Sequence, residues 1–144
     1  MKISTRGRYG TRLLIDLAQH AGESHVTLAS VAGRQNISVR YLEQVAVLLR
    51  RAGFIRSVKG ASGGYALAVS PEDISIGEVL RVLEGDMLVA DPPCPEVTES
   101  RLQRCIRLAV FDRLNARIAK VIDGQTLASL VGTTDPDDAY MYYI

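Results

Sequence analysis

Two cysteines, Cys94 and Cys105, are the side chains of this sequence best suited to reversible chemistry. Thiols can pair in a disulfide, carry a further sulfur atom or ligate a metal. Because the N-terminal residues lack the apolar run of a signal peptide, we expect a cytoplasmic protein whose thiols are reduced by default. Two interpretations follow from the residues. Either the two thiols form a redox switch, or Cys94 is an incidental loop thiol and Cys105 an apolar filler on a buried helix face.

The sequence lacks the motifs of the common enzyme classes. It contains no Ser-His-Asp arrangement, no phosphate-binding loop and no HExxH motif. Its 144 residues, of which 47% are apolar, suffice for one packed domain. No window approaches the roughly 18 consecutive apolar residues of a membrane span. We therefore expect a protein that is not an enzyme and has no membrane partner.

Charge is divided unevenly along the chain. Residues 1–69 carry ten basic and three acidic side chains, whereas residues 70–144 carry seven basic and thirteen acidic ones. A basic half of this kind suggests contact with a polyanion. Within it, the stretch VKGASGGYAL (58–67) places Lys59 beside three glycines, which can turn tightly and let backbone approach a ligand.

Hydrophobic periodicity predicts the elements that hold these residues. The spacing predicts a helix over 7–21, a short helix opened by Thr27, and a longer helix that Ser38 caps and Gly53 ends. The predicted buried positions of the longer helix are Val39, Leu42, Val45, Leu48 and Leu49. Two helices joined by about four residues have the outline of a helix-turn-helix.

The segment after these helices predicts a wing. Apolar and polar residues alternate in 54–69 on either side of the glycines, as in an antiparallel hairpin whose tip holds Gly60, Gly63 and Gly64. The predicted fold is therefore mainly α with a small β-hairpin, a winged helix-turn-helix over 1–70. Residues 38–51 would be the recognition helix in the major groove of DNA.

The acidic half predicts a dimer. A connecting helix and a proline-rich loop are expected over 71–97, a long dimerisation helix over 98–123, and a C-terminal helix and tail over 124–144. The long helix has more apolar residues than one small domain needs, which suggests packing against a second copy. The expected interface positions are Leu102, Ile106, Val110, Leu114 and Ile118. Two-fold symmetry would then place the recognition helices on a palindromic operator.

Four ordered motifs resemble the Rrf2 family of bacterial transcription regulators. They are MKISTRGRYG (1–10), NISVRYLEQV (36–45), VKGASGGYAL (58–67) and IGEVLRVLEG (76–85), and the resemblance covers essentially the whole chain. It implies a single Rrf2-type domain and a sequence-specific transcriptional regulator, expected to be a repressor. Within the family the sequence is most similar to the cysteine-metabolism repressor, because it also ends in AYMYYI (139–144).

The resemblance implies DNA contacts from three segments. On the recognition helix, polar and amide groups can reach base edges or phosphates. The candidates there are Ser38, Arg40, Tyr41, Glu43 and Gln44. Glu43 can accept a hydrogen bond from a cytosine amino group, or alternatively pair with Arg40 or Arg50. The wing candidates are Lys59, Gly60 and Ser62, and the candidate phosphate contacts of the N-terminus are Lys2, Ser4, Thr5 and Arg6.

The resemblance also bears on the thiols. Cluster-binding relatives generally present three cysteines before the long helix, often followed by a histidine. This chain keeps Cys94 and Cys105, but Leu108 stands where the histidine would. Since two thiolates cannot complete the ligands of an iron–sulfur cluster, we expect no cofactor and no metal site. A redox-responsive or iron–sulfur-responsive regulator that uses Cys94 and Cys105 is the alternative.

The C-terminal residues carry a further expectation. The resemblance implies that they associate with cysteine synthase (O-acetylserine thiol-lyase), whose active site accepts a C-terminal isoleucine. A site that holds an amino-acid substrate has donors for an α-carboxylate, which a free Ile144 presents. Tyr143 and Ile144 are the candidate partner-binding residues. Alternatively, the tail packs on the core or on the other protomer.

Overall fold

The computed structural model describes residues 1–60 and 63–133 of the chain. In order, its elements are α1 (Thr5–Gln19), α2 (Leu28–Gln35), α3 (Val39–Arg51), β1 (Ile55–Val58), β2 (Gly64–Leu67), the 3₁₀ turn η1 (Pro71–Asp73), α4 (Ile76–Glu84), α5 (Arg101–Ile106), the π-helical segment η2 (Arg107–Phe111), α6 (Asp112–Asp123) and α7 (Leu127–Thr133). This mainly helical architecture with one two-stranded hairpin confirms the predicted fold class. No helix of the described segments is long and apolar enough to cross a membrane.

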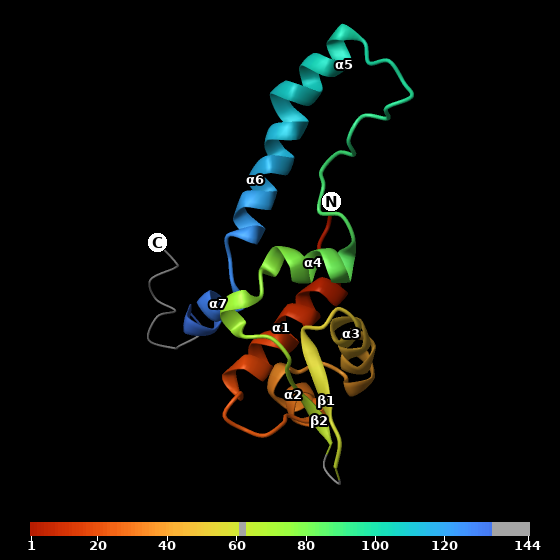
Figure 1. Cartoon of the computed structure of the whole chain (residues 1–144). Coiled ribbons are helices and arrows are strands. Elements are labelled where there is room, and N and C mark those ends of the chain that lie inside the picture. The colour runs from red at the N-terminus through yellow and green to blue at the C-terminus, as the bar shows by residue number, and fades with distance from the viewer. Residues whose placement is uncertain (61–62, 134–144) are drawn as a thin grey trace.

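The elements form a body and an arm (Figure 1). Helices α1 to α4, α7 and the hairpin make up the body, from which α5, η2 and α6 project as one continuous helical arm. The body encloses a single apolar cluster in which Leu13, Leu14, Val31, Leu42, Leu49, Val79 and Leu127 are fully buried. The segment between α4 and α5 runs from the body along the arm to its far end, and the arm helix returns to the body.

Local capping explains how α2 and α3 begin and end. The hydroxyl of Thr27 accepts from the Ser30 amide at 3.2 Å, and that of Ser38 accepts from the Tyr41 amide at 3.2 Å. Each bond satisfies one of the free amides of a helix N-terminus. Asn36 adopts a left-handed conformation (φ 54°) after α2, and Gly53 does so (φ 86°) after α3. These boundaries confirm the predicted helix-turn-helix.

Helix α1 begins two residues earlier than the apolar pattern predicts, at Thr5 instead of residue 7. The physical reason is a cap from another helix. The carboxylate of Glu84, at the end of α4, accepts hydrogen bonds from the backbone amides of Ser4 and Gly7 at 3.0 and 2.8 Å. A cap that arrives from a residue 80 positions away leaves no local signal in the sequence.

The hairpin is a regular antiparallel pair with Ile55 opposite Leu67 and Val58 opposite Gly64. Gly64 therefore lies in β2 and not at the tip, where the sequence predicted it. A Cβ atom on Gly64 would lie 2.4 Å from the carbonyl oxygen of Val26. Val26 and Tyr65 exchange backbone hydrogen bonds of 2.9 and 2.8 Å, so Gly64 allows the chain before α2 to approach the hairpin.

The arm is attached to the body through α4. Arg81 donates to both carboxylate oxygens of Asp123 at 2.6 and 3.0 Å, which joins the middle of α4 to the end of α6. The arm itself begins at Arg101, where Ser100 makes a capping box with Gln103. The predicted long helix thus starts three residues later than expected, because Ser100 supplies the cap.

Candidate DNA-binding surface and sensor arm

Helix α3 presents a row of polar side chains outside the core. Arg40, Glu43 and Gln44 are exposed, while Leu42, Val45 and Leu49 on the opposite side are buried. Ser38 is also exposed, although its hydroxyl oxygen already accepts the capping hydrogen bond. Four of the five predicted recognition residues are therefore exposed at the surface.

Tyr41, the fifth of these residues, is only half-exposed. Its ring packs edge-on against Tyr9 of α1, with centroids 5.3 Å apart and an interplanar angle of 79°. Conversely, α3 exposes Val39, which the apolar pattern predicted to be buried. Val39 is 39% exposed on the first turn. An apolar side chain at this position can contact a thymine methyl group. Val39 directly follows the Ser38 cap, and this position at the helix start could have indicated exposure.

Glu43 of α3 lies at a concavity between α2, α3 and the hairpin. This hollow has a volume of about 400 Å³. It is lined by Thr27 at the start of α2, by Glu43, and by Ser57, Val58 and Gly63 of the hairpin. Across residues 1–60 and 63–133, Glu43 has no ion-pair partner within 4 Å. Arg50, one of its two expected partners, is 3.5 Å from the Ser57 hydroxyl of β1. The Glu43 carboxylate is thus available to a ligand in this hollow.

The wing projects from the body below α3 (Figure 1). Lys59 and Gly60 are exposed near its tip, and Gly60 has φ 155°, a conformation that favours glycine. Ser62, the third wing candidate, lies outside the described residues.

The N-terminal candidates have unequal surroundings. Lys2 and Arg6 are exposed. Ser4 donates its hydroxyl to Glu84 at 2.6 Å, and Thr5 accepts from the Arg8 guanidinium at 3.3 Å. Burial alone would raise the pKa of Glu84, but hydrogen bonds from Ser4 and Gly7 outweigh it and hold the pKa below its ordinary value. Lys2 and Arg6 are the freer of the four to meet phosphate.

One of the basic residues of the N-terminal half, Arg34, pairs with a buried carboxylate of the protein itself. Arg34 donates to both oxygens of Asp16 at 3.0 and 2.7 Å, and the amide of Gln35 donates to Asp16 at 3.0 Å. Burial tends to raise the pKa of the fully buried Asp16, yet these hydrogen bonds lower it below its ordinary value. The sequence analysis did not find this group. An aspartate between Ile15 and Leu17 on an apolar helix was the available signal.

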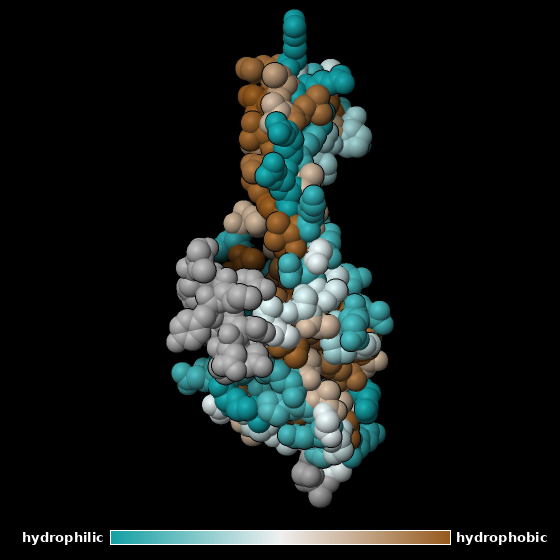
Figure 2. Space-filling model, turned by 90° about the vertical axis from the view of Figure 1, so that its left-hand side faces the viewer, coloured by the Kyte–Doolittle hydropathy of each residue, from teal (hydrophilic) through white to brown (hydrophobic). Residues whose placement is uncertain are grey.

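The arm carries an exposed apolar face, which Figure 2 shows as a hydrophobic stripe along one edge. Of the predicted interface residues, Leu102 is 69% exposed, Ile106, Val110 and Leu114 are exposed, and Ile118 is half-buried. These positions are spaced by four, more than the 3.6 residues of an α-helical turn. Segment η2, whose π-type turns hold more residues, offsets that excess and keeps the stripe on one side. Leu108, Phe111 and Val121, further apolar residues of the arm, are also exposed.

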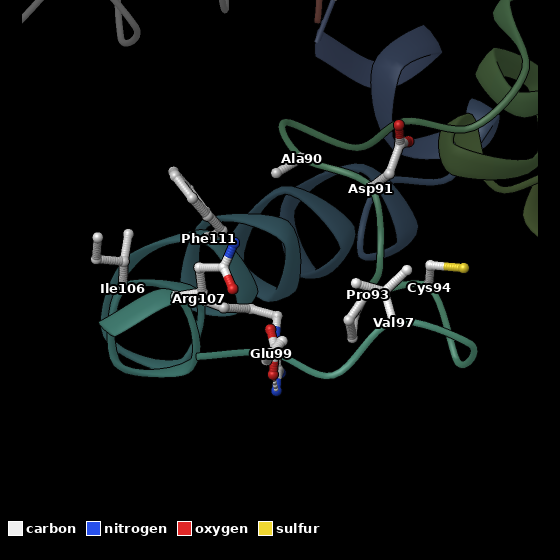
Figure 3. A pocket seen from close by; sticks show the side chains of 10 residues that line it. Ala90, Asp91, Pro93, Cys94, Val97, Glu99, Ile106, Arg107 and Phe111 are labelled. Atoms are coloured by element: carbon white, nitrogen blue, oxygen red, sulfur yellow. Dashed lines mark hydrogen bonds and ion pairs between the residues drawn. The ribbon is translucent and has the colours of Figure 1, made fainter. Parts of the chain in front are cut away.

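A cavity of about 490 Å³ lies between the arm and the preceding segment (Figure 3). Pro93 and Val97 of that segment and Ile106 and Phe111 of the arm contribute apolar side chains. Arg107 pairs with Glu99 at 2.6 Å and with Asp112 at 2.7 Å. The hydrogen bond from Arg107 holds the pKa of Glu99 below its ordinary value. Asn115 fastens the other end by accepting from the Val89 amide and donating to the Ala90 carbonyl, at 2.8 and 2.9 Å.

Both cysteines are free and exposed. Cys94 lines the cavity with its sulfur directed away from Phe111, whereas Cys105 does not line it. Cys105 is exposed in the single chain, so its interpretation as an apolar filler on a buried helix face requires a second copy to cover it and stays a prediction. A disulfide between the two thiols stays a prediction. Tyr143 and Ile144, the candidate partner-binding residues, lie outside the described residues.

Comparison with known proteins identifies the family. The sequence model of the Rrf2 family, described as "Iron-dependent Transcriptional regulator", matches residues 3–133. The chain is 41% identical to the HTH-type transcriptional regulator CymR of Bacillus subtilis, over the full length of both proteins. It is 39% identical to protein rrf2 of Nitratidesulfovibrio vulgaris over 91% of this chain and 87% of that one.

The family description raises the question of iron, and the donor set does not fit it. Across residues 1–60 and 63–133, no group of three or more His, Cys, Asp and Glu side chains could hold a metal ion. An iron–sulfur cluster needs four protein ligands, usually thiolates, and this chain has two cysteines in all.

Solved structures give the same relationship. The structure of CymR, the global cysteine regulator of B. subtilis, superposes with a TM-score of 0.79 at 40% identity, covering 94% of this chain and 99% of that one. T. potens IscR superposes with a TM-score of 0.77 at 40% identity, covering 99% and 97%. Together with the helix-turn-helix and wing, these matches show that the chain belongs to the Rrf2 family of DNA-binding transcriptional regulators.

Proposed function

We propose that this protein is a homodimeric regulator of sulfur or cysteine metabolism genes that binds a palindromic operator through α3 and the wing. In this role the side chains that read or approach base edges are Ser38, Arg40, Tyr41, Glu43, Gln44 and Val39. Lys59, Gly60 and Ser62 of the wing contact the narrow groove or phosphate. Lys2, Ser4, Thr5 and Arg6 lie in the segment assigned to phosphate contact.

The exposed apolar face of the arm is the main support for the proposed dimer. Seven large apolar side chains of α5, η2 and α6 are between 38% and 69% exposed in the single chain. A second copy that packs its own arm against this face buries both. The mass of the protein bound to a 30-base-pair operator duplex tests this: two protomers per duplex are expected, and one would contradict it.

The full-length match to a cysteine regulator supports sulfur metabolism as the regulated process. In this proposal the signal arrives through the C-terminal tail, whose carboxylate at Ile144 enters the active site of cysteine synthase. The enzyme favours the DNA-competent form of the regulator, and the enzyme's substrate displaces the tail and relieves repression.

Isothermal titration of the host's cysteine synthase tests this part. Micromolar or tighter binding by the intact chain that disappears when Ile144 is deleted is the expected result. Equal binding by both forms would move the contact away from the tail. No binding by either form would contradict the proposal that cysteine synthase is a partner. It would leave the proposed DNA binding unaffected.

A thiol-based response is the second candidate, because both cysteines are exposed and Cys94 lines the cavity against the arm. Oxidation would join or modify Cys94 and Cys105 and alter the segment that packs beside the dimer face. Mass spectrometry after peroxide treatment, with an operator titration on the same sample, tests it. Iron and labile sulfide assays on anaerobically purified protein test the cluster alternative.

A further inference from the structure

Three side chains of α1 contact both sides of the turn that connects α2 to α3. Tyr9, Arg12 and Asp16 are three and four residues apart, so they share one face of the helix. Asp16 accepts from the side-chain amide of Gln35, the last residue of α2, at 3.0 Å. Arg12 donates its Nε to the side-chain oxygen of Gln35 at 3.2 Å, and another of its nitrogens donates to the Gln35 carbonyl.

Gln35 is thereby fixed in orientation. Its NH₂ group donates to Asp16, and its oxygen accepts from Arg12, so each end of the amide has one specific partner. The Arg12 bond to its main-chain carbonyl also satisfies an acceptor at the end of α2. The next residue, Asn36, turns the chain toward α3.

On the other side of the turn the contact is aromatic. The Arg12 guanidinium lies 5.5 Å from the centroid of the Tyr9 ring, and the Tyr9 ring meets the Tyr41 ring edge-on at 5.3 Å. Both contacts have favourable electrostatics because of the charge distribution of aromatic rings. Tyr41 lies on the first turn of α3, beside the exposed Arg40.

Stability alone is a weak reason for this arrangement. Asp16 is fully buried, and the structure shows no other buried charged side chain within residues 1–60 and 63–133. Burying a carboxylate costs desolvation energy that its partners only offset, and apolar replacements are often as stable. What such a network does supply is fixed directions, since its hydrogen bonds and ring contacts hold only at defined geometries.

We propose that Tyr9, Arg12 and Asp16 are positioning residues that hold the recognition helix α3 at the angle required for reading bases. The inference rests on the proposed DNA-reading role of α3. Sequence is read by contacts to base edges, which require α3 to lie correctly in the groove, whereas phosphate contacts carry no sequence information. The network therefore sets the preference for operator over other DNA more than it sets overall affinity.

The conservative variant Arg12→Lys tests this directly. Lysine keeps the positive charge but loses the planar fork that holds both oxygens of Gln35 and covers Tyr9. The probes are a duplex enriched by the wild-type protein from a random pool and a scrambled duplex of equal length. We expect operator affinity to fall about tenfold, the size of one lost base contact, and scrambled-duplex affinity to change by less than about twofold.

Two further variants distinguish positioning from loss of folded protein. Asp16→Asn, which removes the charge but keeps the shape, is also expected to lower the ratio of operator affinity to scrambled-duplex affinity. Leu127→Val, a buried change in α7, lowers stability but alters none of the hydrogen bonds or ring contacts of the network. It is expected to leave the ratio of operator to scrambled-duplex affinity unchanged. Equal losses on both duplexes in Arg12→Lys and Asp16→Asn, or no loss on either, would overturn the inference. A wild-type protein that enriches no duplex would instead contradict the proposed function itself.

Discussion

Glu84, the last residue of α4, accepts hydrogen bonds from both the backbone amide and the hydroxyl of Ser4, which precedes α1. The end of one helix thus caps the start of another, 80 residues earlier in the chain. The same helix α4 is joined to the end of the arm by the ion pair of Arg81 and Asp123. Helix α4 therefore connects the arm mechanically to the DNA-binding half.

The Glu84 cap is expected to contribute measurably to stability. In Glu84→Gln, charge-assisted hydrogen bonds to Ser4 and Gly7 become neutral ones, and we expect the free energy of unfolding to fall by about 1–2 kcal/mol. Urea unfolding measures it. Glu96→Gln, which removes the same charge from an exposed loop position, is the control and is expected to change stability by less than about 0.5 kcal/mol. Equal losses in both variants would contradict the cap.

Stability should decline in acid for a defined reason. The pKa values of Glu84 and Asp16 lie below their ordinary values of 4.5 and 3.8 in the folded protein. Their contribution is therefore present above the unfolded-state pKa values and is lost as pH falls through them toward the lowered folded values. Between about pH 5 and pH 3 the melting temperature should fall, and Glu84→Gln should fall less steeply. Parallel curves for the two proteins would exclude Glu84 as a source of the loss.

A charge on the exposed face of the arm should separate the protomers. In Leu114→Glu, a carboxylate would be buried at the proposed dimer interface without a partner, which is strongly unfavourable. Sedimentation at micromolar concentration should show a monomer and operator affinity should drop at least about tenfold, because one half-site is lost. Ala21→Glu adds the same charge in the exposed turn after α1 and should stay dimeric. A dimeric Leu114→Glu protein would place the interface elsewhere.

Lys59 should act through phosphate or the narrow groove. Lys59→Ala is expected to weaken binding of operator and scrambled duplexes by similar factors. It should reduce the slope of log K against log salt concentration by about two, about one for each protomer of the dimer. Lys120→Ala on the arm removes the same charge far from the wing and should leave the slope unchanged. A Lys59→Ala protein that loses affinity for the operator alone would assign this lysine to base reading.

Local sequence signals were sufficient for the helix-turn-helix. Thr27 and Ser38 cap the helices that follow them, and Gly53 ends α3, because each acts within four residues of its own position. The apolar spacing of the arm likewise marked a face that the body does not cover.

Long-range contacts explain what local signals missed. The start of α1 depends on Glu84, and the position of Gly64 in β2 depends on the backbone of Val26. The network around Asp16 joins three elements and could not be assembled from periodicity. Val39 was assigned to the core by its place in an apolar stripe, although its side chain on the first turn of α3 is 39% exposed.

The central claim is that two copies of α3, related by two-fold symmetry, read one DNA site. Sequencing the duplexes that the wild-type protein retains from a random pool tests it most directly. The account predicts an inverted repeat whose half-site centres are separated by one or more whole turns of DNA, each about 34 Å. Enrichment of a single unrepeated half-site, or of no sequence, would contradict it.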